Sequence, residues 1–463
     1  MENKKFKEYK GLDLVAVAGE ELGYWDRNGI FEKSVSQRDG APSFVFFEGP
    51  PSANGMPGIH HVMARTIKDI FCRYKTLRGY QVHRKAGWDT HGLPVELGVE
   101  KELGITKEDI GKKISVEEYN DYCRKVVMRY TDKWNELTRR IGYWVDMEHP
   151  YITYKSKYME TVWWLLSQIY DKGLLYKGYT IQPYSPKAGT GLSSHELNQP
   201  GCYRDVSDTT ITSQFKAVKD TLPESFRKEG DVYFLAWTTT PWTLPSNTAL
   251  AVGDKIDYVI VRTFNQYTFA PQHVILAKEL VPVVFAGKFF EAADDADFEN
   301  YKPEDKKIPC RIAGELKGKD LVGARYEQLM PLVQPYQDAD QAFRVISGDY
   351  VTTVDGTGIV HIAPTFGADD ARVAKEAGIP PMLVLDKAGN PVPLVDLQGR
   401  FIEGLGKYSG MYVKNAYYED GQEPEKSLDV QITIQLKEEN KAFSAAKHTH
   451  SYPHCWRTDK PVL

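Results

Sequence analysis

Two adjacent histidines close a loop rich in glycine and proline, a combination suited to binding phosphate groups. The segment is Gly49-Pro-Pro-Ser-Ala-Asn-Gly-Met-Pro-Gly-Ile-His-His61, which runs from an apolar stretch into a helical pattern. Unpaired backbone N–H groups at a helix N-terminus favour anions, and imidazoles can donate to charge that develops on a transferred phosphoryl group. His60 and His61 are therefore candidate catalytic residues, with a role as polar helix caps as the alternative.

A second cluster places one carboxylate among small residues and a tryptophan. It is Gly87-Trp-Asp-Thr-His-Gly-Leu-Pro-Val-Glu96, and it follows a predicted strand. At the carboxyl end of a strand, Asp89 is suited to hold the cationic amine of an amino-acid substrate. The alternative is a surface loop in which Asp89 caps a helix.

Two further clusters lie in the second half of the chain. The run Trp237-Thr-Thr-Thr-Pro-Trp-Thr-Leu-Pro-Ser-Asn-Thr248 contains two prolines, which exclude a continuous strand, so its hydroxyls are expected to line a loop. The run Gly356-Thr-Gly-Ile-Val-His-Ile-Ala-Pro-Thr-Phe-Gly-Ala-Asp-Asp370 predicts a strand, a turn and a helix that starts near Asp370. His361 alternates with apolar neighbours, so a hydrogen-bonded core histidine is the alternative to a functional one.

The first two clusters follow elements that place them at one sheet edge. Residues 43–47 are almost wholly apolar and predict a buried strand. Apolar residues spaced 4-3-4-3 from Met63 to Leu77 predict a helix that Gly79 ends, and residues 80–83 predict a second strand. This βαβ unit predicts a parallel sheet that binds nucleotides at its carboxyl edge. Helices are expected near 117–140 and 155–172.

The segment from about 200 to 450 has a different pattern. Short β-rich runs separated by Gly, Pro and Asp predict a barrel or sandwich: Val232–Trp237, Tyr258–Thr263, Val274–Ala277, Gly358–Ile362 and Met382–Leu385. The stretch 285–310 contains the polar run 292–297 and is expected to be a surface insertion or mobile loop.

Composition and charge describe an ordinary globular protein of two or three domains. The chain has 463 residues, 42% hydrophobic and 26% charged, and a net charge of −5. The charge gives no support to nucleic-acid binding, although a local basic patch would not show in the average. No signal peptide or membrane span is predicted, which favours a cytoplasmic protein. Five scattered cysteines without a C-x-x-C pair are expected to be reduced core thiols.

Taken together and in this order, the four clusters resemble the N-terminal part of class I aminoacyl-tRNA synthetases, in particular the isoleucine-specific members. The most discriminating motif is G-W-D-T-H-G-L-P-V-E. The resemblance implies an α/β fold: a Rossmann-like parallel-sheet catalytic half-domain over 1–198, an inserted β-barrel-like editing domain over 199–448, and a return segment over 449–463. The second half of the catalytic domain, with the K-M-S-K-S loop, is absent from the sequence.

The resemblance also implies roles for single residues. Pro50 would lie beside the isoleucine side chain and Asp89 would bind its amino group. The residues implied at ATP are Asn54, Gly55, Gly58, His60 and His61. In the insertion, the implied editing residues are Thr238, Thr239, Thr240, Asn247, His361 and Asp370, the last of which would bind the amine of a wrongly attached amino acid.

The chain departs from the family pattern at the histidine loop and at a metal site. The signature His-apolar-Gly-His appears here as Gly58-Ile-His-His61, so only His61 is in register and His60 is expected to replace the first histidine. Bacterial relatives carry a zinc knuckle of two cysteine pairs. The corresponding residues here are Ser185, Ala188, Cys455 and Thr458. One thiolate cannot form a tetrahedral zinc site, so no zinc is expected.

The function implied is that of an isoleucine–tRNA ligase fragment, with ATP and Mg²⁺ as substrate, tRNA(Ile) and isoleucine as partners, no membrane, and a monomeric state. The full enzyme would aminoacylate tRNA(Ile) and hydrolyse misacylated valyl-tRNA(Ile), because a hydrophobic pocket rejects a substrate one methylene smaller only weakly. The fragment alone is expected to be poor at aminoacylation. The alternatives are a stand-alone editing hydrolase, a non-catalytic tRNA-binding module, and a nucleotidyltransferase that shares only the histidine loop.

Overall fold

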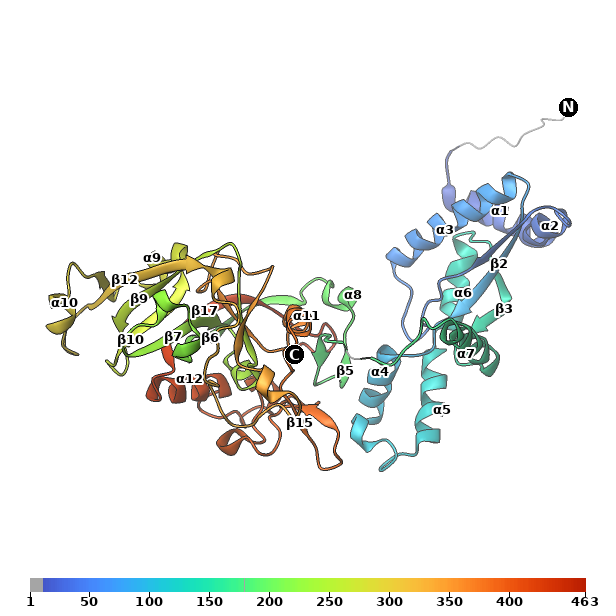
Figure 1. Ribbon diagram of the computed structural model, residues 1–463. Coiled ribbons are helices and arrows are strands. Elements are labelled where there is room, and N and C mark those ends of the chain that lie inside the picture. Colours follow the sequence, from blue (N-terminus) through green and yellow to red (C-terminus); the bar gives the residue numbers. More distant parts are fainter. Residues whose placement is uncertain (1–10, 179) are drawn as a thin grey trace, which may run out of the picture. The chain divides into compact units, whose positions relative to one another are not determined.

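The computed structural model describes residues 11–178 and 180–463. The chain divides into two compact units, Met1–Gly178 and Tyr179–Leu463, which are described in turn (Figure 1). The domain boundaries after residues 198 and 448 stay predictions. Among the described residues, no helix has the length and apolar character needed to cross a membrane.

The first unit is built on a parallel sheet of three strands, in the order β1-β2-β3. The strands are β1 (Ser43–Phe47), β2 (Gln81–Trp88) and β3 (Asp146–Ile152), and helix α3 (Ile59–Leu77) connects the first two. Phe44 lies opposite Val82, and Lys85 lies opposite Asp146. The predicted βαβ unit, the parallel sheet and the α/β class are therefore confirmed. The prediction that residues 43–47 are buried is wrong, because Val45 and Phe47 are each 59% exposed.

The other helices of this unit include the two predicted regions, near 117–140 and 155–172, and three helices that were not predicted. The helices that were not predicted are α1 (Leu14–Asn28), α2 (Ile30–Ser36) and α4 (Leu93–Leu103). The predicted regions hold α5 (Val116–Val127), α6 (Thr131–Arg140) and α7 (Ser156–Asp171), and a short 3₁₀ turn lies at Lys107–Asp109. The helix expected near 117–140 is two helices, because the chain leaves helical geometry at Met128 and Tyr130.

Helix α3 buries its polar side and exposes its apolar side. Its buried residues are Arg65, Asp69, Cys72 and Thr76. The apolar residues that predicted the helix are between 50% and 83% exposed: Met63, Ile67, Ile70, Tyr74 and Leu77. Helix α7 has no buried residue at all, although it carries Trp163, Trp164, Leu165 and Leu166. The first unit thus presents two apolar helix surfaces to solvent.

The second unit contains a seven-stranded sheet in the order β11-β12-β9-β10-β7-β6-β17. Its strands are β6 (Tyr203–Lys216), β7 (Asp231–Thr238), β9 (Asp257–Phe264), β10 (Pro271–Ala277), β11 (Phe289–Glu291), β12 (Ile308–Lys317) and β17 (Ala442–Pro453). A second sheet has the order β13-β8-β14, from Arg344–Ser347, Ala249–Val252 and Ile359–Ile362. Phe215, Phe234, Tyr258 and Trp242 belong to the core between these elements.

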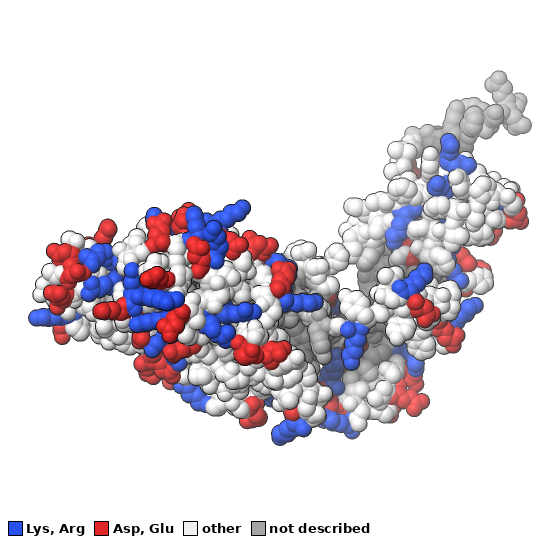
Figure 2. Space-filling model, in the orientation of Figure 1, with Lys and Arg blue, Asp and Glu red and all other residues white. Residues whose placement is uncertain are grey.

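Smaller elements complete this unit. The helices are α8 (Ser194–Leu197), α9 (Val281–Val284), α10 (Ala296–Glu299), α11 (Ala368–Glu376) and α12 (Leu428–Glu438), and two-stranded pairs join β4 (Tyr184–Ser185) to β5 (Thr190–Gly191) and β15 (Leu383–Leu385) to β16 (Pro391–Pro393). Short 3₁₀ turns lie at Lys219–Thr221, Glu224–Phe226, Pro241–Ser246, Lys278–Leu280, Gly318–Asp320, Ala339–Gln341, Gly406–Tyr408 and Asn415–Tyr417. On the visible face of this unit, acidic and basic side chains are intermixed (Figure 2).

The barrel-like shape expected for this part is not confirmed. Among the described residues, no sheet closes on itself, because β11 and β17 are the two ends of the strand order. The stretch 285–310 also differs from a mobile loop. Strand β11 pairs with β12, and Asp295 binds both Arg262 (2.9 Å) and Arg311. This segment is an ordered edge of the sheet whose polar run is fixed by ion pairs.

Candidate functional site

The loop over residues 49–58 is fixed to the elements around it by its backbone. The carbonyl of Ala53 accepts from Tyr130 N (2.9 Å), and that of Gly55 accepts from Trp134 Nε1 (2.9 Å). Asn54 accepts from Ser52 Oγ (3.0 Å) through its side-chain oxygen. The N–H of Asp89 donates to Pro51 O (3.0 Å), which brings the first two sequence clusters together at the carboxyl ends of β1 and β2.

The two histidines sit at the start of α3, and His61 caps it. Gly58 N–H donates to His61 Nδ1 (2.9 Å), so neutral His61 carries its proton on Nε2. Burial lowers the pKa of His61, and the neighbouring His60 and Arg65 lower it further. The His60 ring lies 3.8 Å from that of His61, and a Cβ atom on Gly58 would stand 2.9 Å from His60 Cε1. The absence of a side chain at Gly58 therefore leaves space for the His60 ring. His61 caps the helix, as the alternative expected, and its catalytic role stays a prediction.

The Asp89 carboxylate is exposed and has no bonding partner among the described residues. Its backbone is bound to the Pro51 loop, and the next residue, Thr90, donates from its N–H to Thr153 Oγ1 (3.0 Å). The main chain is thus fixed while the charge stays available. Pro50 is half-buried in the neighbouring loop, and the structure gives no contact between its side chain and Asp89.

A buried carboxylate beneath this loop was not among the predicted site residues. Glu48, at the end of β1, is 2% exposed, receives Lys68 Nζ at 2.5 Å, and accepts a hydrogen bond from the Tyr143 hydroxyl. Burial raises the pKa of Tyr143, and the bond to Glu48 raises it further. The signal for Glu48 in the sequence was a charge directly after an apolar strand, where buried acids need partners.

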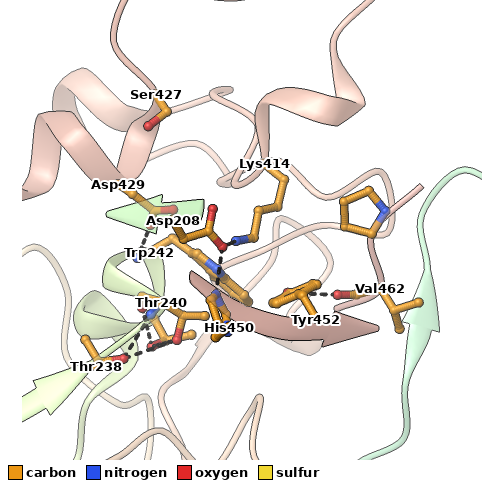
Figure 3. Close-up of polar contacts among 12 residues, drawn as sticks. Asp208, Thr238, Thr240, Trp242, Lys414, Ser427, Asp429, His450, Tyr452 and Val462 are labelled. Atoms are coloured by element: carbon orange, nitrogen blue, oxygen red, sulfur yellow. Dashed lines mark hydrogen bonds and ion pairs between the residues drawn. The ribbon is translucent and has the colours of Figure 1, made fainter. Parts of the chain in front are cut away.

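In the second unit, the threonine run forms a turn between β7 and the 3₁₀ helix Pro241–Ser246. Thr240 N–H donates to Thr238 Oγ1 (3.1 Å), and the two hydroxyls lie 3.2 Å apart (Figure 3). Thr239 is half-buried, and its hydroxyl has no partner among the described residues. The loop expected from the two prolines is confirmed, and Thr239 carries its free hydroxyl.

His361 is buried and bonded at both ring nitrogens. Asn247 Nδ2 donates to His361 Nδ1 (2.8 Å), so the proton of the neutral ring is on Nε2 and points to Thr243 Oγ1 (3.0 Å). Thr243 in turn donates to Thr240 O (2.8 Å), and Tyr326 donates to Asn247 Oδ1 (2.7 Å). Burial lowers the pKa of His361 to about 4, so the ring is neutral near pH 7. Thr243 and Tyr326 were not predicted as site residues.

Asp370 lies in the first turn of α11, beyond the end of the strand that carries His361. It accepts from Ala363 N (2.9 Å) and from the Tyr350 hydroxyl (3.4 Å). Burial raises the pKa of Asp370, and these hydrogen bonds partly offset the rise. Among the described residues, no hydrogen bond joins Asp370 to the threonine run.

The described residues contain no group of three or more His, Cys, Asp or Glu side chains that could hold a metal ion. Of the four residues expected to correspond to a zinc knuckle, Ser185 and Cys455 are fully buried. Ser185 Oγ accepts from Ala188 N (3.3 Å), and Cys455 O accepts from Thr458 N (3.2 Å). A hydrogen bond thus closes each of these two segments, and the absence of zinc stays a prediction.

Comparison with known proteins decides the family. Residues 20–321 match the model of the family tRNA synthetases class I (I, L, M and V). The chain belongs to this family. It is 62% identical to the isoleucine–tRNA ligase of Bacteroides fragilis (strain YCH46) and 59% identical to that of Porphyromonas gingivalis (strain ATCC BAA-308 / W83); each alignment covers 100% of this chain and 41% of the relative. The chain thus spans about two fifths of the length of these relatives.

Among solved structures, the crystal structure of GlLeuRS-CP1 matches with a TM-score of 0.32 and 16% identity, over 51% of this chain and 96% of that chain.

Proposed function

We propose that this chain is the N-terminal part of an isoleucine–tRNA ligase, a cytoplasmic monomer that joins isoleucine to tRNA(Ile) with ATP and Mg²⁺. The observation that carries the proposal is 62% identity to a protein of that name along the whole chain. The unpartnered Asp89 carboxylate would bind the ammonium group of isoleucine, with Pro50 beside its side chain. The residues proposed at ATP are Asn54, Gly55, Gly58, His60 and His61.

We further propose that the catalytic sheet is only half present, as a Rossmann-like half-domain interrupted by an insertion. The three-stranded sheet and the exposed apolar sides of α3 and α7 support this view, since such surfaces are normally covered. The pairing of β6 with β17 supports an insertion, because it brings the two ends of that segment together. Alone, the chain would activate isoleucine poorly.

The second unit is proposed to hydrolyse valine-charged tRNA(Ile). Water would attack the ester carbonyl, the bond from that carbon to the ribose oxygen would break, and the ribose oxygen would take a proton from the water, leaving valine and free tRNA. Thr238, Thr239 and Thr240 would orient the water and substrate, and Asp370 would bind the valine ammonium group. His361 is neutral and bonded at both nitrogens, which supports a role in fixing Asn247 and Thr243 rather than in taking the proton.

Deacylation of valine-charged tRNA(Ile) by the 463-residue chain tests this proposal. We expect hydrolysis above the uncatalysed rate, reduced at least about tenfold in Asp370→Ala, because an ammonium group would lose its carboxylate. Asp369→Ala is the matched control, since Asp369 is 72% exposed and only 4.0 Å from Arg372. Equal rates for wild type and Asp370→Ala would refute the role of Asp370.

Pyrophosphate exchange separates the synthetase from the alternatives. Isoleucine-dependent exchange, even at a low rate, would support a ligase fragment. Deacylation without exchange would favour a stand-alone hydrolase, and tRNA binding without either activity would favour a binding module.

A further inference from the structure

A partly buried cluster of ionisable side chains is attached to the segment that follows the threonine run. It is formed by Asp208 of β6, Lys414, Asp429 of α12, and His450 and Tyr452 of β17 (Figure 3). Lys414 and Asp429 are 8% and 5% exposed. Buried charges are costly unless they are paired, so this cluster needs a structural or functional reason.

Lys414 forms an ion pair with one of the two carboxylates in this cluster and acts on the other only at longer range. Lys414 Nζ lies 2.9 Å from Asp208 Oδ2 and 4.5 Å from the centroid of the Tyr452 ring, and His450 Nε2 lies 3.2 Å from the same Asp208 oxygen. Asp208 is therefore well supplied with partners. Asp429 receives only the longer-range attraction of Lys414 and Lys447, against the repulsion of Asp208.

The hydrogen bond that Asp429 makes is to the threonine segment itself. Its Oδ1 accepts from Trp242 N (2.9 Å). Trp242 lies in the first turn of the 3₁₀ helix Pro241–Ser246, where a backbone N–H has no acceptor within the helix. The Trp242 indole N–H has no partner among the described residues, so the bond to Asp429 is the one hydrogen bond that the described structure gives to an N–H of Trp242. The Trp242 ring also packs edge-on against Phe366, with the ring centroids 4.9 Å apart.

This attachment lies next to the bonds that fix the site. Trp242 stands between Thr240, whose backbone bonds to Thr238, and Thr243, which binds His361 Nε2 at 3.0 Å. A shift of Trp242 would move both threonines relative to the imidazole. We propose that Asp429 is a positioning residue for the hydrolysis of misacylated tRNA, a role that rests on the proposed function: it fixes the threonine run against His361 without touching the substrate.

Charge strengthens this hydrogen bond, because an ionised acceptor binds an N–H more tightly than a neutral one. Burial raises the pKa of Asp429 to about 7, and Lys414 partly offsets the rise. As the pH falls through 7, Asp429 gains a proton and its bond to Trp242 weakens. Asp429→Asn keeps a side-chain oxygen acceptor but does not titrate, so it imitates the protonated state at every pH.

The test compares three variants in the 463-residue chain with valine-charged tRNA(Ile). Asp429→Ala removes the acceptor and should lower kcat of deacylation at least tenfold with KM changed less than threefold. Asp429→Asn should lower kcat only about threefold at pH 8 and should remove the decline of wild-type activity below pH 7. Ser427→Ala is the matched control, because Ser427 caps the same helix through Val430 N (3.4 Å) without contacting Trp242; its activity should equal that of wild type.

Wild-type hydrolysis tests the proposed function, and the ratios of variant to wild type test the positioning role. Thermal unfolding must show that Asp429→Ala is folded at the assay temperature. If it is not, the comparison of Asp429→Asn with wild type across pH 5.5–8.5 decides alone. The inference is overturned by equal loss in Ser427→Ala and Asp429→Ala, by a change in KM alone, or by the same pH profile in wild type and Asp429→Asn.

Discussion

At the residue scale, the hydrogen bonds of His361 agree with the core-histidine alternative, and its editing role stays a prediction. The residue is a hydrogen-bonded core histidine, 8% exposed, and it also links Asn247 to Thr243 in the predicted editing segment. With Nδ1 accepting and Nε2 donating, the ring has no free lone pair with which to take a proton. Its contribution is geometric, since it fixes the distance between the strand that carries it and the 3₁₀ helix.

The hydroxyls of Thr243 and Thr239 are expected to act differently. Thr243→Val leaves His361 Nε2–H buried without an acceptor, so the free energy of unfolding should fall by about 1–3 kcal/mol. Thr239→Val removes a hydroxyl that has no partner among the described residues, so stability should stay within about 0.5 kcal/mol. Deacylation should fall in both variants.

Urea denaturation and a deacylation assay of the two valine variants check this prediction. Normal hydrolysis in Thr239→Val would exclude its hydroxyl from substrate binding. Loss of stability in Thr239→Val equal to that in Thr243→Val would contradict the difference in bonding.

The sequence led to some of these residues and not to others for physical reasons. Thr238, Thr239, Thr240, Asn247, His361 and Asp370 stand in compact motifs, so a family pattern can point to them, and their roles stay predictions. Tyr326 is 79 positions from Asn247, and only the fold brings its hydroxyl within 2.7 Å. Asp429 is 187 positions from Trp242 and carries no local signal.

At the scale of the element, periodicity predicted α3 correctly, and the structure shows that the apolar side of this helix is the exposed one. The helical spacing of the apolar residues predicted the helix. The buried side of the helix, however, contains Arg65, Asp69 and Thr76. Arg84, buried on β2, reaches Asp69 Oδ1 at 3.6 Å and Thr76 Oγ1 at 2.7 Å. Periodicity measures where apolar residues lie on a helix, and it cannot tell which partner is present to cover them.

Substitutions on α3 should therefore affect stability in the reverse of the order that hydrophobicity suggests. Changes on the apolar side should cost little, and changes on the polar side should cost more. Ile70→Ser replaces a side chain that is 59% exposed and should change the free energy of unfolding by less than about 0.5 kcal/mol. Asp69→Asn leaves the buried Arg84 without its counter-charge and should cost about 3 kcal/mol. Urea denaturation of the 463-residue chain compares the two, and a larger loss in Ile70→Ser would show that α3 packs the other way round.

At the scale of the whole molecule, the pairing of β6 with β17 closes a long segment of the second unit. The two strands run antiparallel from Tyr203 opposite Pro453 to Ser213 opposite Ala442. The segment from residue 203 to residue 453 therefore begins and ends at neighbouring positions on two paired strands. The change in sequence pattern near residue 200 could indicate that this segment folds as a compact unit. It could not indicate an open sheet, because short strands with frequent turns occur in barrels and open sheets alike.

A chain limited to residues 203–453 is expected to fold alone. Its termini are already paired, and the largest core, which includes Phe215, Tyr258 and Leu436, lies inside it. Circular dichroism should show one cooperative thermal transition within about 5 °C of the corresponding transition of the 463-residue chain. A shallow, non-cooperative melt would show that the flanking segments 180–202 and 454–463 are required for folding.

The same pairing has an evolutionary consequence. Paired strands lie about 4.8 Å apart, so the polypeptide that leaves at Tyr203 returns at Pro453 almost where it left. If this 251-residue segment were removed, a short turn could join the two chain ends that remain, because they lie side by side and closing them costs little entropy. A segment with this geometry can be gained, lost or exchanged between relatives in one genetic event, so the error correction that we propose for it is free to evolve separately from the aminoacylation that we propose for the full enzyme.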